Sequence, residues 1–157
     1  MTTDFIVKGL PSESFAHLVD LSNAQLAERG VHVSVSDSVP GYPCRVSLAD
    51  VPVGEDVLLI NYEHLPAATP FRSNGPIFVK RNASSTQPSP NEIPEVLRGR
   101  PLSVRGYDKG GMMWDADLVQ GHCVESLIER LFENPEIDFL HIHFAKRGCY
   151  ACAVERA

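Results

Sequence analysis

The sequence predicts an α+β fold that consists of a mostly antiparallel sheet of about seven strands with two to three helices. Three observations lead to this prediction. Short apolar runs are separated by turns marked by proline and glycine, and only one segment has a long helical period. Strand-like and helical segments also do not alternate strictly, which disfavours a parallel sheet. Barrel-like closure of the sheet is left open.

The first thirty residues predict one short strand and two short helices. Residues 5–7 read as an opening strand, and a helical turn begins at Pro11. Ser22 and Gln25 have the spacing of a capping box, so we expect a second helix from Ser22. Gly30 is placed to end that helix.

The next segments have the period of β-strands. Residues 31–35 alternate valine with histidine or serine, as in a half-buried strand. Residues 45–48 and 56–64 are expected to form a strand pair, with residues 49–55 as the connecting turn. Residues 77–80 are a further short strand.

The second half of the chain predicts a loop, two strands, one helix and a terminal hairpin. Residues 82–94 hold four serines or threonines and three prolines, so we expect a mobile loop that could act as a lid. Residues 102–107 and 112–119 read as strands. Residues 122–133 form the one convincing amphipathic helix, and residues 139–154 form two final strands joined by a short turn.

Bulk composition restricts the class of protein. A chain of 157 residues is expected to form a single domain over residues 1–157. Its net charge of −6 disfavours nucleic acid as a partner. No run is long and apolar enough to span a membrane, and no secretory signal is visible, so we expect a cytoplasmic protein without membrane attachment. Its four cysteines are then expected to be thiols.

The terminal hairpin carries the densest chemistry of the sequence. His141 and His143 lie on one face of the first strand, because alternate residues of a strand share a face. A three-residue loop with Gly148 in the left-handed conformation suits the turn. In that register His141 opposes Ala153 and His143 opposes Ala151, which leaves space beside both imidazoles.

The same register predicts different surroundings for the two hairpin cysteines. Cys149 lies diagonal to His143 on the histidine face, and Cys152 points to the apolar face. A slip of one residue would instead bring Cys152 opposite His143. Because Gly148 favours the first register, we select Cys149 as the candidate nucleophile.

The His-x-His pair also has the geometry of two metal ligands. The cupin pattern would place a glutamate three to five residues after the second histidine, but residues 146–148 are lysine, arginine and glycine. A third ligand would have to come from Glu63, His64 or Cys149. We therefore assign no metal ligands from the sequence and keep a metal site as an alternative.

Two other segments offer polar groups. The apolar strand at residues 56–64 ends in Asn61-Tyr62-Glu63-His64, and strand ends are places where catalytic groups are held on a rigid frame. Arg45 and Arg72 lie in constrained turns and could together clamp an anion.

Four separated segments resemble one known family: residues 40–45, 61–64 and 75–78, and the His141-x-His143 ending with Gly148-Cys149. They resemble the bacterial family called domain of unknown function 1203, and the resemblance covers residues 5–156. It implies a single cytosolic bacterial domain and supplies no activity.

The sequence-based hypothesis is a pocket for a small anionic molecule, with catalytic potential. Three candidate catalytic residues are proposed, His143, Cys149 and His64, with His143 as general base. The candidate ligand-binding residues are Arg45, Tyr62, Asn61, Arg72 and His141. No cofactor is assigned. The alternatives are a non-catalytic interaction domain that forms homo-oligomers, and a histidine-based metal-binding protein.

Overall fold

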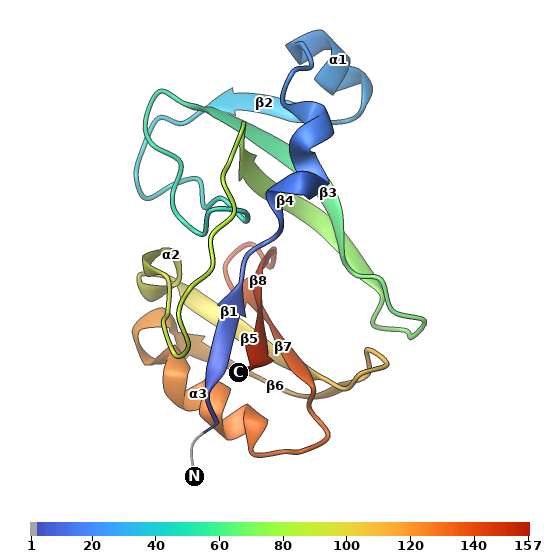
Figure 1. Ribbon diagram of the computed structural model, residues 1–157, viewed down its shortest axis with the longest axis vertical. Coiled ribbons are helices and arrows are strands. Elements are labelled where there is room, and N and C mark those ends of the chain that lie inside the picture. The colour runs from blue at the N-terminus through green and yellow to red at the C-terminus, as the bar shows by residue number, and fades with distance from the viewer. Residues whose placement is uncertain (1–2) are drawn as a thin grey trace.

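The computed structural model describes residues 3–157 and confirms the α+β class. The described strands form two antiparallel sheets, one of five strands in the order β1-β8-β7-β5-β6 and one of three strands in the order β2-β3-β4 (Figure 1). Neither sheet closes into a barrel. The strands are β1 (Phe5–Lys8), β2 (His32–Val35), β3 (Asp56–Leu65), β4 (Ser73–Lys80), β5 (Pro101–Tyr107), β6 (Met113–Gln120), β7 (Phe139–Phe144) and β8 (Tyr150–Arg156).

Short helices accompany both sheets. The α-helices are α1 (Asn23–Glu28), α2 (Glu95–Arg98) and α3 (Val124–Phe132), and the 3-10 helices are η1 (Ser12–Leu18) and η2 (Gly121–Cys123). One buried cluster, the first core, joins α2 and α3 to the five-stranded sheet. A second core joins η1 and α1 to the three-stranded sheet. Helix α2 was not expected from the sequence.

The local helix signals are confirmed. The side chain of Ser22 accepts a hydrogen bond from the backbone N–H of Gln25, and Gln25 accepts one from the N–H of Ser22, which completes the capping box. Gly30 follows α1 with φ of 76°. The apolar stripe of α3 is buried in the first core, as its period predicts.

The predicted strand at residues 45–48 is wrong. This segment is a turn in which the N–H of Leu48 donates to the carbonyl of Cys44, with φ of 55° at Leu48. Val46 is buried in the second core and Leu48 in the first. The apolar alternation therefore arises because the turn lies between two cores, and not because the segment is extended.

The hairpin of β7 and β8 follows the predicted register only in part. His141 pairs with Ala153 as expected, and Gly148 has the predicted positive φ of 77°. His143 pairs with Tyr150 and not with Ala151, because the register shifts between Ile142 and His143. This bulge leaves one extra residue in β8, so a large aromatic ring lies where the sequence predicted a small side chain.

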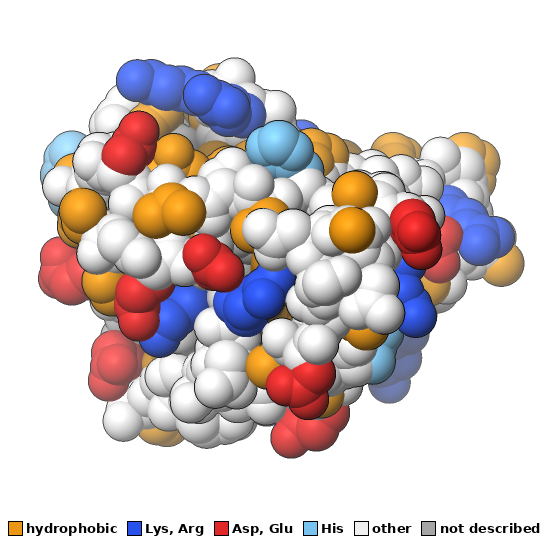
Figure 2. All heavy atoms as spheres, turned by 90° about the horizontal axis from the view of Figure 1, so that it is seen from above, with side chains coloured by type: hydrophobic (Ala, Val, Ile, Leu, Met, Phe, Trp, Pro, Cys, Tyr) orange, Lys and Arg blue, Asp and Glu red, His pale blue; other side chains and the backbone are white. Residues whose placement is uncertain are grey.

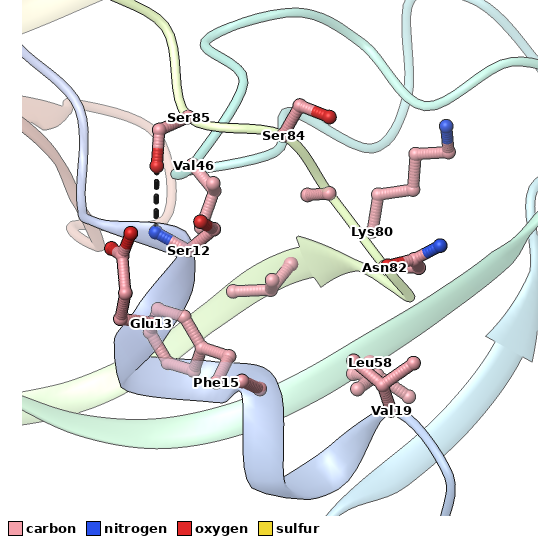
Figure 3. A pocket seen from close by; sticks show the side chains of 13 residues that line it. Ser12, Glu13, Phe15, Val19, Val46, Leu58, Lys80, Asn82, Ser84 and Ser85 are labelled. Atoms are coloured by element: carbon pink, nitrogen blue, oxygen red, sulfur yellow. Dashed lines mark hydrogen bonds between the residues drawn. The ribbon is translucent and has the colours of Figure 1, made fainter.

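Residues 82–94 form an irregular connection, as predicted. The hydroxyl of Ser85 accepts a hydrogen bond of 2.7 Å from the backbone N–H of Ser12, at the start of η1 (Figure 3). The start of the loop and η1 line an open cavity of about 350 Å³ together with residues of β3 and β4. The first residues of the loop therefore contact η1, which packs on the three-stranded sheet.

Two further features concern possible partners. No helix within residues 3–157 combines the length and hydropathy that crossing a membrane requires. The face drawn in Figure 2 carries basic, acidic and hydrophobic side chains in a mixture, without a continuous basic patch.

Candidate functional site

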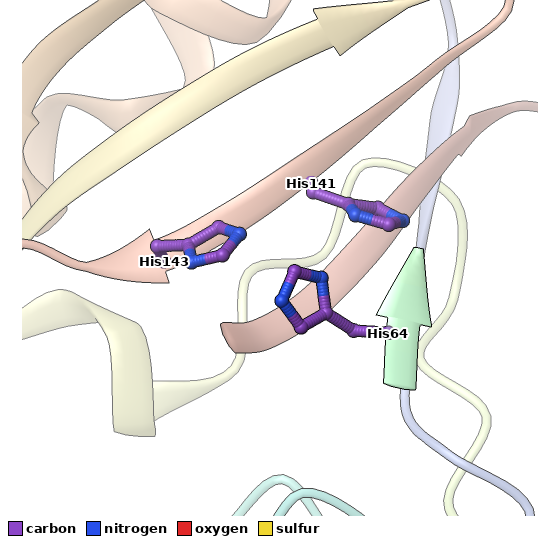
Figure 4. Close-up of side chains that lie close together, drawn as sticks. All are labelled: His64, His141 and His143. Carbon is purple, nitrogen blue, oxygen red and sulfur yellow. The ribbon is translucent and has the colours of Figure 1, made fainter. Parts of the chain in front are cut away.

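Three histidines from two sheets meet in one place (Figure 4). His141 and His143 project from β7 of the five-stranded sheet, and His64 projects from the end of β3 in the three-stranded sheet. One ring nitrogen of each lies within 4.8 Å of those of the other two. The pairing of β3 with β4 shifts between Tyr62 and Leu65, so His64 lies in an irregular part of its strand. We call these residues the histidine cluster.

The histidine cluster is neutral at physiological pH. His141 is 5% exposed and His143 is 2% exposed. Burial, followed by the neighbouring histidines, lowers the pKa of His141 to about 3, and burial followed by Arg105 lowers the pKa of His143 to about 4. Burial and Arg105 also lower the pKa of His64. Each imidazole therefore offers one nitrogen lone pair.

Hydrogen bonds determine which nitrogen carries the lone pair in His143. Its Nδ1 lies 2.9 Å from the carbonyl oxygen of Gly148. Because a carbonyl oxygen can only accept, Nδ1 carries the proton and Nε2 keeps the lone pair. The Nδ1 atoms of His64 and His141 are buried without a hydrogen-bond partner, which is costly in a folded protein.

Two side chains outside the sequence prediction surround the cluster. Nη1 of Arg105 lies 3.4 Å from Nε2 of His143. The ring of Tyr150 stacks on His64 and meets the edge of His141. Arg105 pairs directly with His141 across β5 and β7. The sequence shows that residues 103, 105 and 107 of β5 are polar and alternate with apolar residues. It does not show that β5 pairs with β7.

Cys149 has a different partner from the one predicted. Its Sγ accepts a hydrogen bond of 3.0 Å from Nη2 of Arg45. Among the described residues, no hydrogen bond joins this sulfur to His143. Cys152 is buried in the first core, as predicted, and burial raises the pKa of its thiol to about 12.

Arg45 itself is almost fully buried, with 1% of its surface exposed. Its Nε donates to the carbonyl of Tyr150 at 2.7 Å and its Nη1 donates to the carbonyl of Pro43 at 2.6 Å. Burial lowers the pKa of Arg45. Its guanidinium group also lies 4.9 Å from the ring centre of Phe144.

The remaining predicted ligand residues have other partners in the structure. Arg72 is exposed and forms an ion pair of 2.9 Å with Glu63, so it does not share a clamp with the buried Arg45. Tyr62 packs against Phe15 of η1, with ring centres 5.9 Å apart. Asn61 is exposed on β3.

Comparisons with curated proteins and with solved structures gave no significant match. A family model matches residues 41–156, a range that contains the histidine cluster, Arg45 and Cys149. The match confirms the resemblance inferred from the four sequence segments. The chain belongs to the family described as "Protein of unknown function (DUF1203)".

Proposed function

We propose that this protein binds a divalent transition metal through His64, His141 and His143. The observation that carries the proposal is the approach of three ring nitrogens to within 4.8 Å. Tetrahedral zinc with Zn–N bonds of about 2.0–2.1 Å needs ligand atoms about 3.3 Å apart. His64 is only half-buried, so a small shift of its ring parallel to the ring of Tyr150 is the movement that closes this gap.

The surroundings of the cluster support this proposal. In metal sites, a histidine ligand usually donates its second N–H to a carbonyl or carboxylate, which orients the ring. The carbonyl of Gly148 provides that acceptor for His143. A metal bound to the unpartnered nitrogens of His64 and His141 would remove the cost of burying them.

Three histidine ligands leave one coordination position open, which is typical of catalytic and not of structural zinc sites. A metal in such a site lowers the pKa of bound water and polarises a substrate oxygen. Arg105, whose Nη1 lies 3.4 Å from Nε2 of His143, would attract an anionic substrate. The reaction class we propose is therefore metal-assisted attack by water on a small anionic substrate.

This proposal replaces the sequence-based choice of His143 as general base for Cys149 as our leading hypothesis. The thiol of Cys149 is hydrogen-bonded to Arg45, and Nδ1 of His143 is hydrogen-bonded to Gly148. The three histidines, by contrast, already face one another. The geometry thus favours the metal alternative that the sequence left open.

We also propose a cytoplasmic location. All four cysteines are free thiols, and two of them, Cys44 and Cys152, are buried. Free thiols are typical of reducing compartments.

The test is the metal content of tag-free protein, measured by inductively coupled plasma mass spectrometry after expression with zinc, iron and cobalt salts. We expect near-stoichiometric transition metal in the wild-type protein and little metal in His141→Ala, because two histidines make an incomplete ligand set. His32→Ala is the matched control, because His32 is exposed on β2. Metal-free wild-type protein that also fails to bind added Zn²⁺ or Co²⁺ would refute the proposal.

Arg105 provides an independent check. Its positive charge opposes a cation at His143. Arg105→Met should therefore raise the affinity for Co²⁺, followed by the visible absorption of tetrahedral cobalt. A cobalt affinity that falls in this variant would contradict a metal site at Nε2 of His143.

A further inference from the structure

A second cavity, of about 780 Å³, has Cys149 among its lining residues. Residues from both sheets line it, including the turn between β7 and β8. Its aromatic lining is formed by Tyr42, Phe78 and Phe144, of which the first two rings meet edge to face. The cavity therefore has room and apolar surface for a small organic molecule.

The charge of this cavity is opposite to that of the whole chain. Its charged lining residues are the cationic Arg45, Arg100, Lys146 and Arg147 and the anionic Asp50 and Glu95, which leaves two positive charges in excess. The chain as a whole has a net charge of −6. Arg100 forms an ion pair of 2.8 Å with Asp50. Lys146 and Arg147 are exposed on the β7–β8 turn, and neither forms an ion pair with a carboxylate among the described residues.

One of these cations, the guanidinium of Arg45, is buried and has no carboxylate partner among the described residues. Its hydrogen bonds go to two carbonyl oxygens and to the sulfur of Cys149. Burying a charge without a counter-charge is costly. Cys149, whose sulfur accepts a hydrogen bond from this buried cation, also lines the cavity.

We propose that this cavity binds a small organic anion and holds it beside the thiol of Cys149. Lys146 and Arg147 attract the anionic group, and the aromatic walls contact its apolar body. The thiol of Cys149, hydrogen-bonded to Arg45, then lies next to the bound ligand. This inference is independent of the proposed metal site.

The test compares two alkylating probes, iodoacetate, which is anionic, and iodoacetamide, which is neutral. In both reactions the sulfur forms a bond to the CH₂ carbon, iodide leaves with the bonding electron pair, and the thiol proton passes to solvent. The ratio of the two rates at one cysteine cancels the reactivity of that thiol. What remains is the preference of its surroundings for an anion.

The reaction is followed at each cysteine by peptide mass spectrometry in the presence of EDTA. Cys123 is the internal reference, because it is exposed and lies outside the cavity. We expect the iodoacetate-to-iodoacetamide ratio to be about tenfold higher at Cys149 than at Cys123, for about two net charges near the thiol. The double variant Lys146→Ala/Arg147→Ala should remove most of this preference.

The matched control is Arg29→Ala/Lys109→Ala, which removes the same two charges from exposed positions outside the cavity. It should leave the ratio at Cys149 unchanged. Equal ratios at Cys149 and Cys123, no reaction of Cys149 with either probe, or an unaltered ratio in the Lys146/Arg147 variant would each overturn the proposal. The presence of EDTA keeps the result separate from that of the metal test.

Discussion

The ring of Tyr150 lies parallel to that of His64, with 7° between the planes and 5.1 Å between the ring centres. This stack joins β8 of one sheet to the end of β3 of the other. The backbone carbonyl of Tyr150 also accepts the hydrogen bond from Arg45. One residue therefore contacts both the histidine cluster and the buried cation of the second cavity.

The stack predicts that the ring of Tyr150 orients His64 for metal binding. Tyr150→Phe keeps the ring and should bind Zn²⁺ like the wild-type protein. Tyr150→Leu removes the stack and should weaken Zn²⁺ binding about tenfold or more. Calorimetric titration against a competing chelator measures both affinities, with circular dichroism as a check on folding. Equal affinities in the folded Leu and Phe variants would contradict this role.

Burial of the neutral histidines predicts a pH-dependent stability in metal-free protein. The pKa of His141 is about 3 in the folded chain and about 6.5 in an unfolded one. Above pH 6.5 the imidazole of His141 is neutral in both the folded and the unfolded chain, so its titration does not change the free energy of unfolding. As pH falls below 6.5, only the unfolded state gains the proton, so the free energy of unfolding decreases by up to about 1.4 kcal/mol per pH unit.

Urea unfolding at pH 7.5 and pH 5.5 in EDTA measures this decrease. His141→Gln removes one titrating group and should reduce the pH-dependence. His32→Gln, at an exposed position, is the matched control, and the pH-dependence should fall further in the His141 variant than in this one. If the His141 variant loses as much stability between the two pH values as the wild-type protein, His141 is not neutral in the folded state.

Gly121 allows a close approach between η2 and the end of α2. A Cβ at this position would lie 1.7 Å from the carbonyl oxygen of Leu97. Gly121→Ala should therefore lower the free energy of unfolding by about 2–4 kcal/mol. The matched control is Gly99→Ala, because a Cβ there meets no atom within 4 Å, and its effect should stay within about 0.5 kcal/mol. Similar effects of the two changes in urea unfolding would contradict this packing.

The two arginines that the sequence proposed as one clamp should differ in their effect on stability. Arg45→Lys leaves three hydrogen bonds in a buried site incompletely replaced and should cost about 2–4 kcal/mol. Arg72→Lys changes an exposed ion pair and should cost less than about 1 kcal/mol. Thermal and urea unfolding compare the two. A neutral Arg45→Lys would show that the guanidinium is not a structural group.

The sequence by itself determined most of the local elements, but not the turn at residues 45–48 or α2. The capping box of Ser22 and Gln25, the apolar stripe of α3 and the alternation of β7 each depend on residues a few positions apart. Periodicity and capping report such short-range contacts directly. For the same reason the positive φ of Gly148 was predictable. The sequence also identified His64, His141, His143, Arg45 and Cys149 as candidates without deciding which of them meet.

Only the tertiary structure determined which of these residues contact one another. His64 reaches the β7 histidines because two separate sheets pack together, and Arg105 joins them because β5 pairs with β7. The bulge in β8 replaces Ala151 by Tyr150 opposite His143. These contacts link segments far apart in the chain, and their register is determined by packing and not by any local period. The sequence therefore identified the three histidines as separate candidates. Only the folded structure shows that they form one site.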